Sequence, residues 1–406
     1  MPTLGETIKA LRKEKKLTQS DVAGEQMTKG MLSLIENDKA QPSMDNLKYI
    51  ATKLQVDVGQ LMGDYQDQQA LRALIREAEM MLQDWLHVDK RQVLDLLTPH
   101  VEKFKPLTTF EEIRLFDLYS QMALSVHHVF DEQTFLQLSE RYENLGLYDY
   151  MIHCYFSMMG HAFFSKNYPQ VFQYITDATK KFEQYYLVIS DAVKLDFYYN
   201  KMIAATTFES GYSWKNDAEK ALSLSKQTRL YYRTNDFYRF LFTHAIEERD
   251  DALAKHYLNK LTLYSELAEL PLDRAAVHLF TMTYEIFIQR DIDAAIQIPM
   301  PVDPIVNDVF DFDISHKALL CYCYLQKEDF ETCYETWKEM RVADEMAHPL
   351  DRLAIFFGIA AGAMAAYELG HTQEAKKEIL FILNEIKDYP RMSYTKFIED
   401  VAKKVL

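Results

Sequence analysis

LTQSDVA at Leu17–Ala23 and MTKGMLSLIENDKAQPSMDNL at Met27–Leu47 are the stretches that decide the fold of this sequence. In the second stretch Leu32 and Ile35 are spaced as neighbours on one face of a helix. Pro42 ends any helix that precedes it, because proline lacks a backbone N–H and fixes its own φ. The two stretches therefore predict short helices joined by tight turns.

Residues on either side of these stretches extend the same pattern to about five helices of 8–12 residues. A helix often begins after a Ser, Thr or Asp whose side chain accepts a backbone N–H bond, sometimes with a polar residue three positions later reaching back. The candidates are Thr3 with Glu6, Thr18 with Asp21, Thr28, Ser43, and Asp57 with Gln60. Five capped helices around one small core predict a self-contained N-terminal domain.

The motif in these stretches resembles the helix-turn-helix of Cro and phage repressors, and it spans about 60 residues. The resemblance implies DNA-contacting positions at Gln19, Thr28, Lys29, Gly30, Ser33, Lys39 and Gln41. Thr28 and Ser33 can hydrogen-bond base edges or phosphate, and the lysines can contact phosphate. Two departures affect this expectation. The turn at Gly24–Met27 is one residue shorter than the usual pattern, and Gly30 stands where a larger polar residue is common.

Several of these residues have a structural alternative. Thr28 can act as an N-cap alone, and Lys29 and Lys39 can be solvated surface charges. Met31 and Leu34 can be packing residues, or exposed apolar groups that meet another subunit. The sequence leaves these alternatives open.

Charge is distributed unevenly along the chain. The 406 residues carry 61 acidic and 45 basic side chains, a formal net charge of −16. Residues 1–62 hold nine of the basic and eight of the acidic side chains, so this segment is nearly neutral and residues 63–406 are strongly acidic. Because DNA is a polyanion, we expect the N-terminal segment alone to contact it.

The remainder of the chain shows amphipathic helices in pairs. Gly and Pro total 22 residues, about half their usual frequency, which argues against a turn-rich β fold. Polar turns recur at intervals of about 35 to 48 residues, which is typical of an α-solenoid. The predicted turns are at 166–168, 214–217, 249–251, 290–292, 328–330 and 370–372. We expect an all-α protein.

The helix pairs resemble tetratricopeptide repeats, most clearly at Ile359–Leu380, and about six to nine pairs are expected. Pro299–Asp313 is predicted to be a long loop, and Arg391–Leu406 a terminal capping helix. Asparagine or arginine on the concave side of such an array can bind a peptide backbone. Candidate peptide-binding residues are Asn200, Arg239, His161, Tyr284 and Tyr322, although aromatic residues in these helices more often belong to the core.

No catalytic, cofactor-binding or phosphate-loop motif is present, so we expect neither an enzyme nor a cofactor. The cysteines Cys154, Cys321, Cys323 and Cys333 form no C-x-x-C pair and are expected to be reduced core residues. Asp308, Asp311, Asp313 and His316 match no calcium loop, and an acidic helix N-terminus explains them, so no metal is expected. The longest apolar run, Leu353–Tyr367, is shorter than the ~20 residues that span a bilayer. The N-terminus shows no signal-peptide pattern, so a cytoplasmic protein is expected.

The combination of a Cro-type domain and a tetratricopeptide-like body resembles the peptide-responsive regulators of the Rap, Rgg, NprR, PlcR and PrgX type, with NprR-like length. The resemblance implies a cytoplasmic transcription factor that binds double-stranded DNA at two half-sites and a short signalling peptide in quorum sensing. A homodimer or tetramer is expected, because one small domain neutralises few phosphates. Two alternatives stay open: a Rap-like or dual-role protein that also binds a response regulator, and a regulator gated by another protein or small molecule.

The expected organisation has three parts. Residues 1–65 form the helix-turn-helix domain, residues 66–86 a connecting helix, and residues 87–406 the repeat domain with its capping helix. No membrane association is expected.

Overall fold

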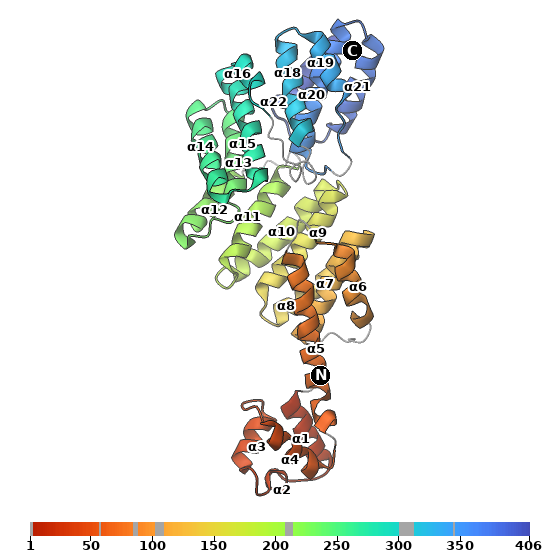
Figure 1. The fold of residues 1–406 in the computed structure, drawn as a ribbon, viewed down its shortest axis with the longest axis vertical. Coiled ribbons are helices and arrows are strands. Elements are labelled where there is room, and N and C mark those ends of the chain that lie inside the picture. The colour runs from red at the N-terminus through yellow and green to blue at the C-terminus, as the bar shows by residue number, and fades with distance from the viewer. Residues whose placement is uncertain are drawn as a thin grey trace. The chain divides into compact units, whose positions relative to one another are not determined.

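The computed structural model describes residues 3–56, 58–83, 88–101, 109–207, 214–299, 312–343 and 346–406. All regular secondary structure in these ranges is helical, which confirms the all-α prediction (Figure 1). The chain divides into two compact units, Met1–Leu145 and Gly146–Leu406. The predicted domain boundaries at residues 65 and 86 both fall inside the first unit and stay predictions.

The first four helices form the small core of unit 1. Their buried side chains include Ile8, Leu32 and Ile35. Capping boxes at Thr3 and Thr18 and single N-cap bonds at Thr28 and Ser43 begin the helices where the sequence predicted. The elements are α1 (Leu4–Glu14), α2 (Gln19–Ala23), α3 (Lys29–Glu36) and α4 (Met44–Leu54).

Two details of the predicted helices were wrong. The second helix, α2, has only 5 residues instead of 8–12. The fifth short helix and the connecting helix are one continuous helix, α5 (Val58–Gln83), of 26 residues. No proline interrupts this segment, and its Gln, Ala and Leu residues favour helix throughout. The predicted cap at Asp57 lies outside the described residues.

The rest of unit 1 packs on α5. Apolar residues from α5, α6 (Lys90–Val101) and α7 (Phe110–His127) form a second buried cluster that includes Leu71, Leu97 and Leu118. The unit ends with α8 (Glu132–Asn144).

Unit 2 is a series of antiparallel helix pairs (Figure 1). Five predicted turns separate consecutive helices as expected, and α12 begins at the sixth, after Trp214. The elements are α9 (Tyr148–Phe164), α10 (Tyr168–Tyr185), α11 (Asp191–Ala205), α12 (Lys215–Thr228), α13 (Thr234–Glu247), α14 (Asp251–Ala268), α15 (Pro271–Tyr284), the π-helical segment η1 (Glu285–Gln289), α16 (Ile292–Ile296), α18 (Phe312–Gln326), α19 (Phe330–Lys338), α20 (Pro349–Glu368), α21 (Thr372–Glu385) and α22 (Ser393–Val405).

The largest described core of unit 2 surrounds α20. Small residues such as Ala363 on α20 and Ala375 on α21 are fully buried there, within the helix pair at Ile359–Leu380. The tetratricopeptide assignment itself stays a prediction. The predicted capping helix is confirmed as α22.

The predicted loop at Pro299–Asp313 ends earlier than expected, because Phe312 and Asp313 already belong to α18. Residues 300–311 lie outside the described part of the chain. All four cysteines are free and buried, as expected.

Among the described residues, the helix α20 is long and apolar enough to cross a membrane by length and composition. However, 78% of its most apolar window is buried inside the protein, since neighbouring helices pack on it. Its composition is therefore explained by a position in the core.

Candidate nucleic-acid interface and candidate ligand site

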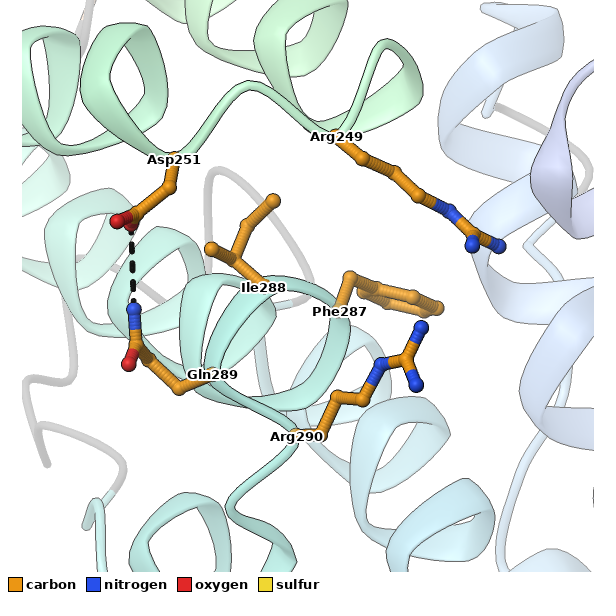
Figure 2. Close-up of a pocket in the computed structure, with 6 residues that line it drawn as sticks. All are labelled: Arg249, Asp251, Phe287, Ile288, Gln289 and Arg290. Atoms are coloured by element: carbon orange, nitrogen blue, oxygen red, sulfur yellow. Dashed lines mark hydrogen bonds between the residues drawn. The ribbon is translucent and has the colours of Figure 1, made fainter.

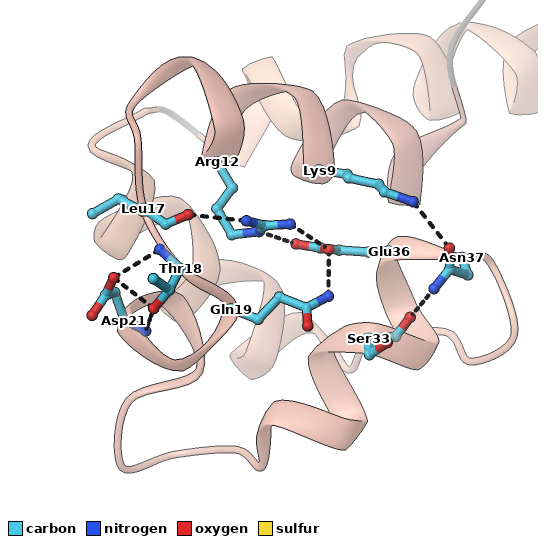
Figure 3. Close-up of polar contacts among 9 residues, drawn as sticks. All are labelled: Lys9, Arg12, Leu17, Thr18, Gln19, Asp21, Ser33, Glu36 and Asn37. Carbon is cyan, nitrogen blue, oxygen red and sulfur yellow. Dashed lines mark hydrogen bonds and ion pairs between the residues drawn. The ribbon is translucent and has the colours of Figure 1, made fainter.

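A buried ion pair fixes α1 against α3. Arg12 Nε lies 2.5 Å from Glu36 Oε1, and its Nη2 donates to Oε2 at 2.9 Å (Figure 3). Gln19 Nε2 at the start of α2 donates to the same carboxylate at 2.8 Å. Burial alone would raise the pKa of Glu36, but the hydrogen bonds from Arg12 and Gln19 outweigh it and lower that pKa. The carboxylate of Glu36 on α3 therefore connects this helix to both α1 and α2.

Close backbone approaches set the same geometry. A Cβ on Gly5 would lie 2.3 Å from the carbonyl oxygen of Ile35, so α1 and α3 touch at a point where only glycine fits. Gly24, which ends α2, has φ +52°, and a Cβ there would meet the hydroxyl of Tyr49 at 2.1 Å. Glycine is therefore required at position 24, at the start of the turn between α2 and α3, both by the positive φ and by the lack of space for a Cβ.

Six of the seven predicted DNA-contacting residues lie on or beside α3, away from this core. Thr28 is an N-cap whose hydroxyl accepts the N–H of Met31 at 3.1 Å, so the capping role is confirmed. The Lys29 and Lys39 ammonium groups are exposed and form no ion pair with a described residue. The structure places Thr28, Lys29, Gly30, Lys39 and Gln41 at exposed positions and Ser33 at a partly exposed one.

Gln19 differs from the other candidates, because its amide nitrogen is engaged by Glu36. No local sequence pattern predicts this bond, since the partner is 17 residues away. Arg12 was missed for the same reason: it lies 24 residues from Glu36, and no local pattern marks it.

A second ionic network lies in unit 2, on the first helices of three successive pairs. Arg233 Nε, before α13, is 3.0 Å from Asp196 Oδ1 on α11, and its Nη1 is 3.3 Å from Asp236 Oδ2. Arg239 on α13 continues the row, with Nη2 2.8 Å from Asp273 Oδ1 on α15. The row therefore connects α11, α13 and α15 through charges.

Arg239 is incompletely paired within this network. Its Nε is buried and has no hydrogen-bond acceptor among the described residues. Burial raises the pKa of the neighbouring Asp236, although Arg239 and Arg233 oppose that rise. A buried donor without an acceptor costs about 1–3 kcal/mol, so the network is not fully satisfied within the described residues.

The structure places the other predicted peptide-binding residues as follows, and their role in binding stays a prediction. Asn200 lies on α11 beside the network, and its amide nitrogen donates to the carbonyl of Asp196 at 2.8 Å. Tyr284 donates to Asp251 at 2.6 Å, and the centroid of the Tyr322 ring lies 4.7 Å from that of Phe357. His161 is partly buried on α9 and has a partner of its own.

A separate open pocket of about 400 Å³ lies next to η1 (Figure 2). On one side Gln289 donates to Asp251 at 3.2 Å. On the other side the guanidinium groups of Arg249 and Arg290 extend past the Phe287 ring, and neither forms an ion pair with a described residue. The pocket therefore combines an apolar surface with two cations.

The described residues contain no cluster of three or more His, Cys, Asp or Glu side chains placed to hold a metal. Asp308 and Asp311 lie outside them. Asp313 pairs with Lys317 at 3.0 Å, and His316 contacts the carbonyl of Ile298 at 3.2 Å.

Comparison with known proteins identifies the N-terminal segment. Residues 8–61 match the family described as helix-turn-helix. The immunity repressor protein of Bacillus phage phi105 is 38% identical over 63 residues, which span 15% of this chain and 44% of the repressor. The Cro and phage-repressor resemblance is confirmed for this segment.

Solved structures of peptide-responsive regulators are similar to the chain at low scores. Bacillus thuringiensis PlcR in complex with the peptide PapR7 and DNA has a TM-score of 0.40 and 18% identity, covering 68% of this chain and 99% of PlcR. ComR from S. thermophilus, in complex with DNA and its signalling peptide, has a TM-score of 0.29 and 15% identity, covering 68% and 97%. Scores this low leave the ligand of unit 2 to be argued from its own residues.

Residues 8–61 therefore form a helix-turn-helix domain of the Cro and phage-repressor type.

Proposed function

We propose that this chain is a cytoplasmic transcription regulator whose helix-turn-helix domain binds two DNA half-sites as a dimer or tetramer, and whose unit 2 binds a short signalling peptide. The peptide changes the fraction of chains in the DNA-competent oligomer, by no more than its difference in affinity for the two states.

The exposed face of α3 supports the DNA-binding part of the proposal. The second helix of a helix-turn-helix enters the major groove, and its first residues approach base edges. Lys29 stands at the first position of α3, and Lys39 follows the helix. Both cations are unpaired within the described residues, so each is available to a phosphate.

The Arg239 side chain on α13, which is 31% exposed, is the observation that carries the peptide-binding part. A peptide presents a carbonyl oxygen at every residue, and such an oxygen can accept from a guanidinium without reading the peptide's side chains. Asn200 lies on the neighbouring helix α11, and its side-chain oxygen can accept a hydrogen bond from a peptide N–H. The pocket beside η1 can also contribute to peptide binding, because its arginines Arg249 and Arg290 favour a carboxylate of the peptide.

The DNA-binding part is tested by the salt dependence of affinity. Loss of one phosphate contact should reduce the slope of log K against log salt by about 0.9. We expect this change for Lys29→Ala and for Lys39→Ala, and no change for Lys13→Ala, an exposed lysine on α1. Unchanged slopes in both test variants would mean that α3 does not face the duplex.

The peptide-binding part is tested by purifying the full chain from its host and searching for bound short peptides by mass spectrometry. A recovered peptide is then titrated against wild type and Arg239→Met, with Arg229→Met as the matched exposed control. We expect weaker binding only for Arg239→Met, and a change in DNA affinity when peptide is added to wild type. Recovery of a small molecule or a protein instead would support the alternative ligand classes.

A further inference from the structure

The outer face of α3 contains an unusual set of side chains. At about 100° per residue, the side opposite the buried Leu32, Ile35 and Glu36 is formed by Gly30, Leu34 and the C-cap Asn37, and Ser33 lies on its flank. This line is therefore the part of the helix that points farthest from the core. If α3 enters the major groove, this line faces the base edges.

Hydrogen-bonding groups are scarce along this line. Gly30 has no side chain, and Leu34 is apolar. The amide nitrogen of Asn37 donates to the carbonyl of Ser33 at 2.7 Å, and its oxygen accepts from Lys9 Nζ at 3.1 Å (Figure 3). The groups that most often read bases by hydrogen bonds are thus absent from Gly30 and Leu34 and engaged at Asn37.

Apolar surface is exposed at the same place. Among the described residues 3–56, the large apolar side chains that are exposed are Met31 (37%), Leu34 (45%) and Met44 (54%). Leu34 lies near the centre of the outer line of α3, and Met31 lies one turn before it on one flank. Leu34 is not part of the buried core of this domain, so core packing does not explain an apolar residue at this exposed position.

Space beside Leu34 is open toward the helix N-terminus. A Cβ built on Gly30 would meet only the Thr28 hydroxyl, at 3.8 Å. A group on the DNA can therefore approach the helix backbone at Gly30 and contact the Leu34 side chain from that side. The apolar group that a duplex displays in its major groove is the C5-methyl of thymine.

We infer that Leu34 determines sequence specificity by apolar contact with a thymine methyl in the major groove. The inference rests on the DNA-binding function and adds the base that is read and the residue that reads it. It follows that each half-site contains a required T·A pair, recognised by burial of the methyl group and not by a hydrogen bond.

The test begins with selection of bound duplexes from a random pool by the full-length protein. Each thymine in the selected site is then replaced by uracil, which removes one methyl group and leaves base pairing intact. Burial of one methyl corresponds to about a fourfold change in affinity. We expect such a loss at one thymine in each half-site for wild type.

The variant Leu34→Ala identifies the residue involved. It should bind thymine and uracil duplexes equally at that position, because the methyl loses its partner. The control Leu136→Ala removes an exposed leucine on α8, outside the helix-turn-helix domain, and should keep the fourfold ratio. Because uracil replacement in the wild-type complex changes only the DNA, that result does not depend on how the variants fold.

Three outcomes would overturn the inference. If no uracil replacement weakens binding, or if Leu34→Ala keeps the ratio, Leu34 does not read a methyl although the protein still binds DNA. If Leu34→Ala instead reduces the oligomer mass and leaves the ratio intact, Leu34 belongs to a subunit contact. If no sequence is enriched at all, the DNA-binding function fails together with the inference.

Discussion

At the scale of single residues, the carboxylate of Glu36 is the most demanding group in the helix-turn-helix domain. Its side chain is fully buried, and that of Arg12 is 11% exposed. Removal of one partner from such a pair leaves a buried charge unpaired, which typically costs 3–5 kcal/mol. We predict that Arg12→Met destabilises this domain by about 3 kcal/mol, measured as amide hydrogen exchange in α1 to α3 faster by more than a hundredfold.

The matched control is Arg76→Met, which makes the same change at an exposed arginine on α5 and should leave exchange in α1 to α3 unaltered. The double variant Arg12→Met with Glu36→Leu removes both charges and should recover most of the lost protection. Normal protection in the single variant would contradict the structural role given to the pair.

The same carboxylate predicts a dependence of stability on pH. The pKa of Glu36 is lower in the folded domain than the value of about 4.3 expected in an unfolded chain. The folded state therefore binds its proton less readily than the unfolded state does. The stabilisation is fully present above that unfolded value and is lost as the pH falls through it toward the folded pKa.

We predict a steeper loss of thermal midpoint below pH 5 in wild type than in Glu36→Gln, which cannot titrate. The midpoint can be followed through the methyl NMR signals of Ile8 and Ile35, both buried in this domain. Equal slopes in the two proteins would show that Glu36 has the same pKa folded and unfolded.

Residues of the site were predictable from sequence when their role is local. The cap at Thr28 and the exposure of Lys29 follow from positions within one helix turn, and both are found in the structure. The bond from Gln19 to Glu36 and the outward position of Leu34 depend on how three helices pack. Such contacts have no signal in a single sequence.

At the scale of elements, glycines show where helices of unit 2 are pressed together. A Cβ on Gly362, which is buried in α20, would lie 2.2 Å from the Cβ of Trp337 in α19, a residue of the core that surrounds α20. Overpacking of this kind typically costs 1–3 kcal/mol. We predict that Gly362→Ala lowers the thermal midpoint of unit 2 by about 4–8 °C, measured by near-ultraviolet circular dichroism.

Gly160 on α9 is the matched control, because it is also helical and has nothing within 4 Å of an added Cβ. Replacement of such a glycine by alanine removes backbone freedom from the unfolded chain and should raise the midpoint by a few degrees. A rise for both variants would mean that α19 and α20 separate at no cost, contrary to the packing described.

Element boundaries failed where no residue marks an end. No cap or proline marks the predicted break between the fifth helix and the connecting helix, and α5 continues through it to Gln83. By contrast, the turns after Arg249 and Arg290 were predicted correctly. Each of these arginines has a positive φ and precedes an aspartate that caps the next helix.

At the scale of the whole molecule, the helical class and the pairing of helices followed from composition and turn spacing. Contacts between helix pairs that are distant in the sequence could not be predicted in this way. Tyr168 on α10 donates to the carbonyl of Ala347, 179 residues away, and Glu247 accepts from Ser393. These bonds join the first and middle pairs of unit 2 to its last, and only the folded chain reveals them.

At the same scale, the distribution of charge along the chain determines how we expect the protein to bind DNA. The helix-turn-helix segment is nearly neutral and the rest of the chain is acidic, so a single copy offers few cations to a duplex. We therefore expect two copies in a tight and specific complex. If the acidic parts of two chains pair and hold the two helix-turn-helix domains, both must meet the same side of the duplex. The spacing of the half-sites then becomes a property of the protein.

We predict that five base pairs inserted between the half-sites reduce affinity to that of a single half-site. One turn of B-DNA contains about 10–10.5 base pairs, so this insertion moves one half-site to the opposite side of the duplex. Ten inserted base pairs return both half-sites to the same side of the duplex and should recover part of the affinity. The extent of this recovery measures how far the paired chains can extend. Undiminished binding after the five-base-pair insertion, measured by fluorescence anisotropy, would show that each domain binds independently and that pairing of the acidic parts does not set the spacing.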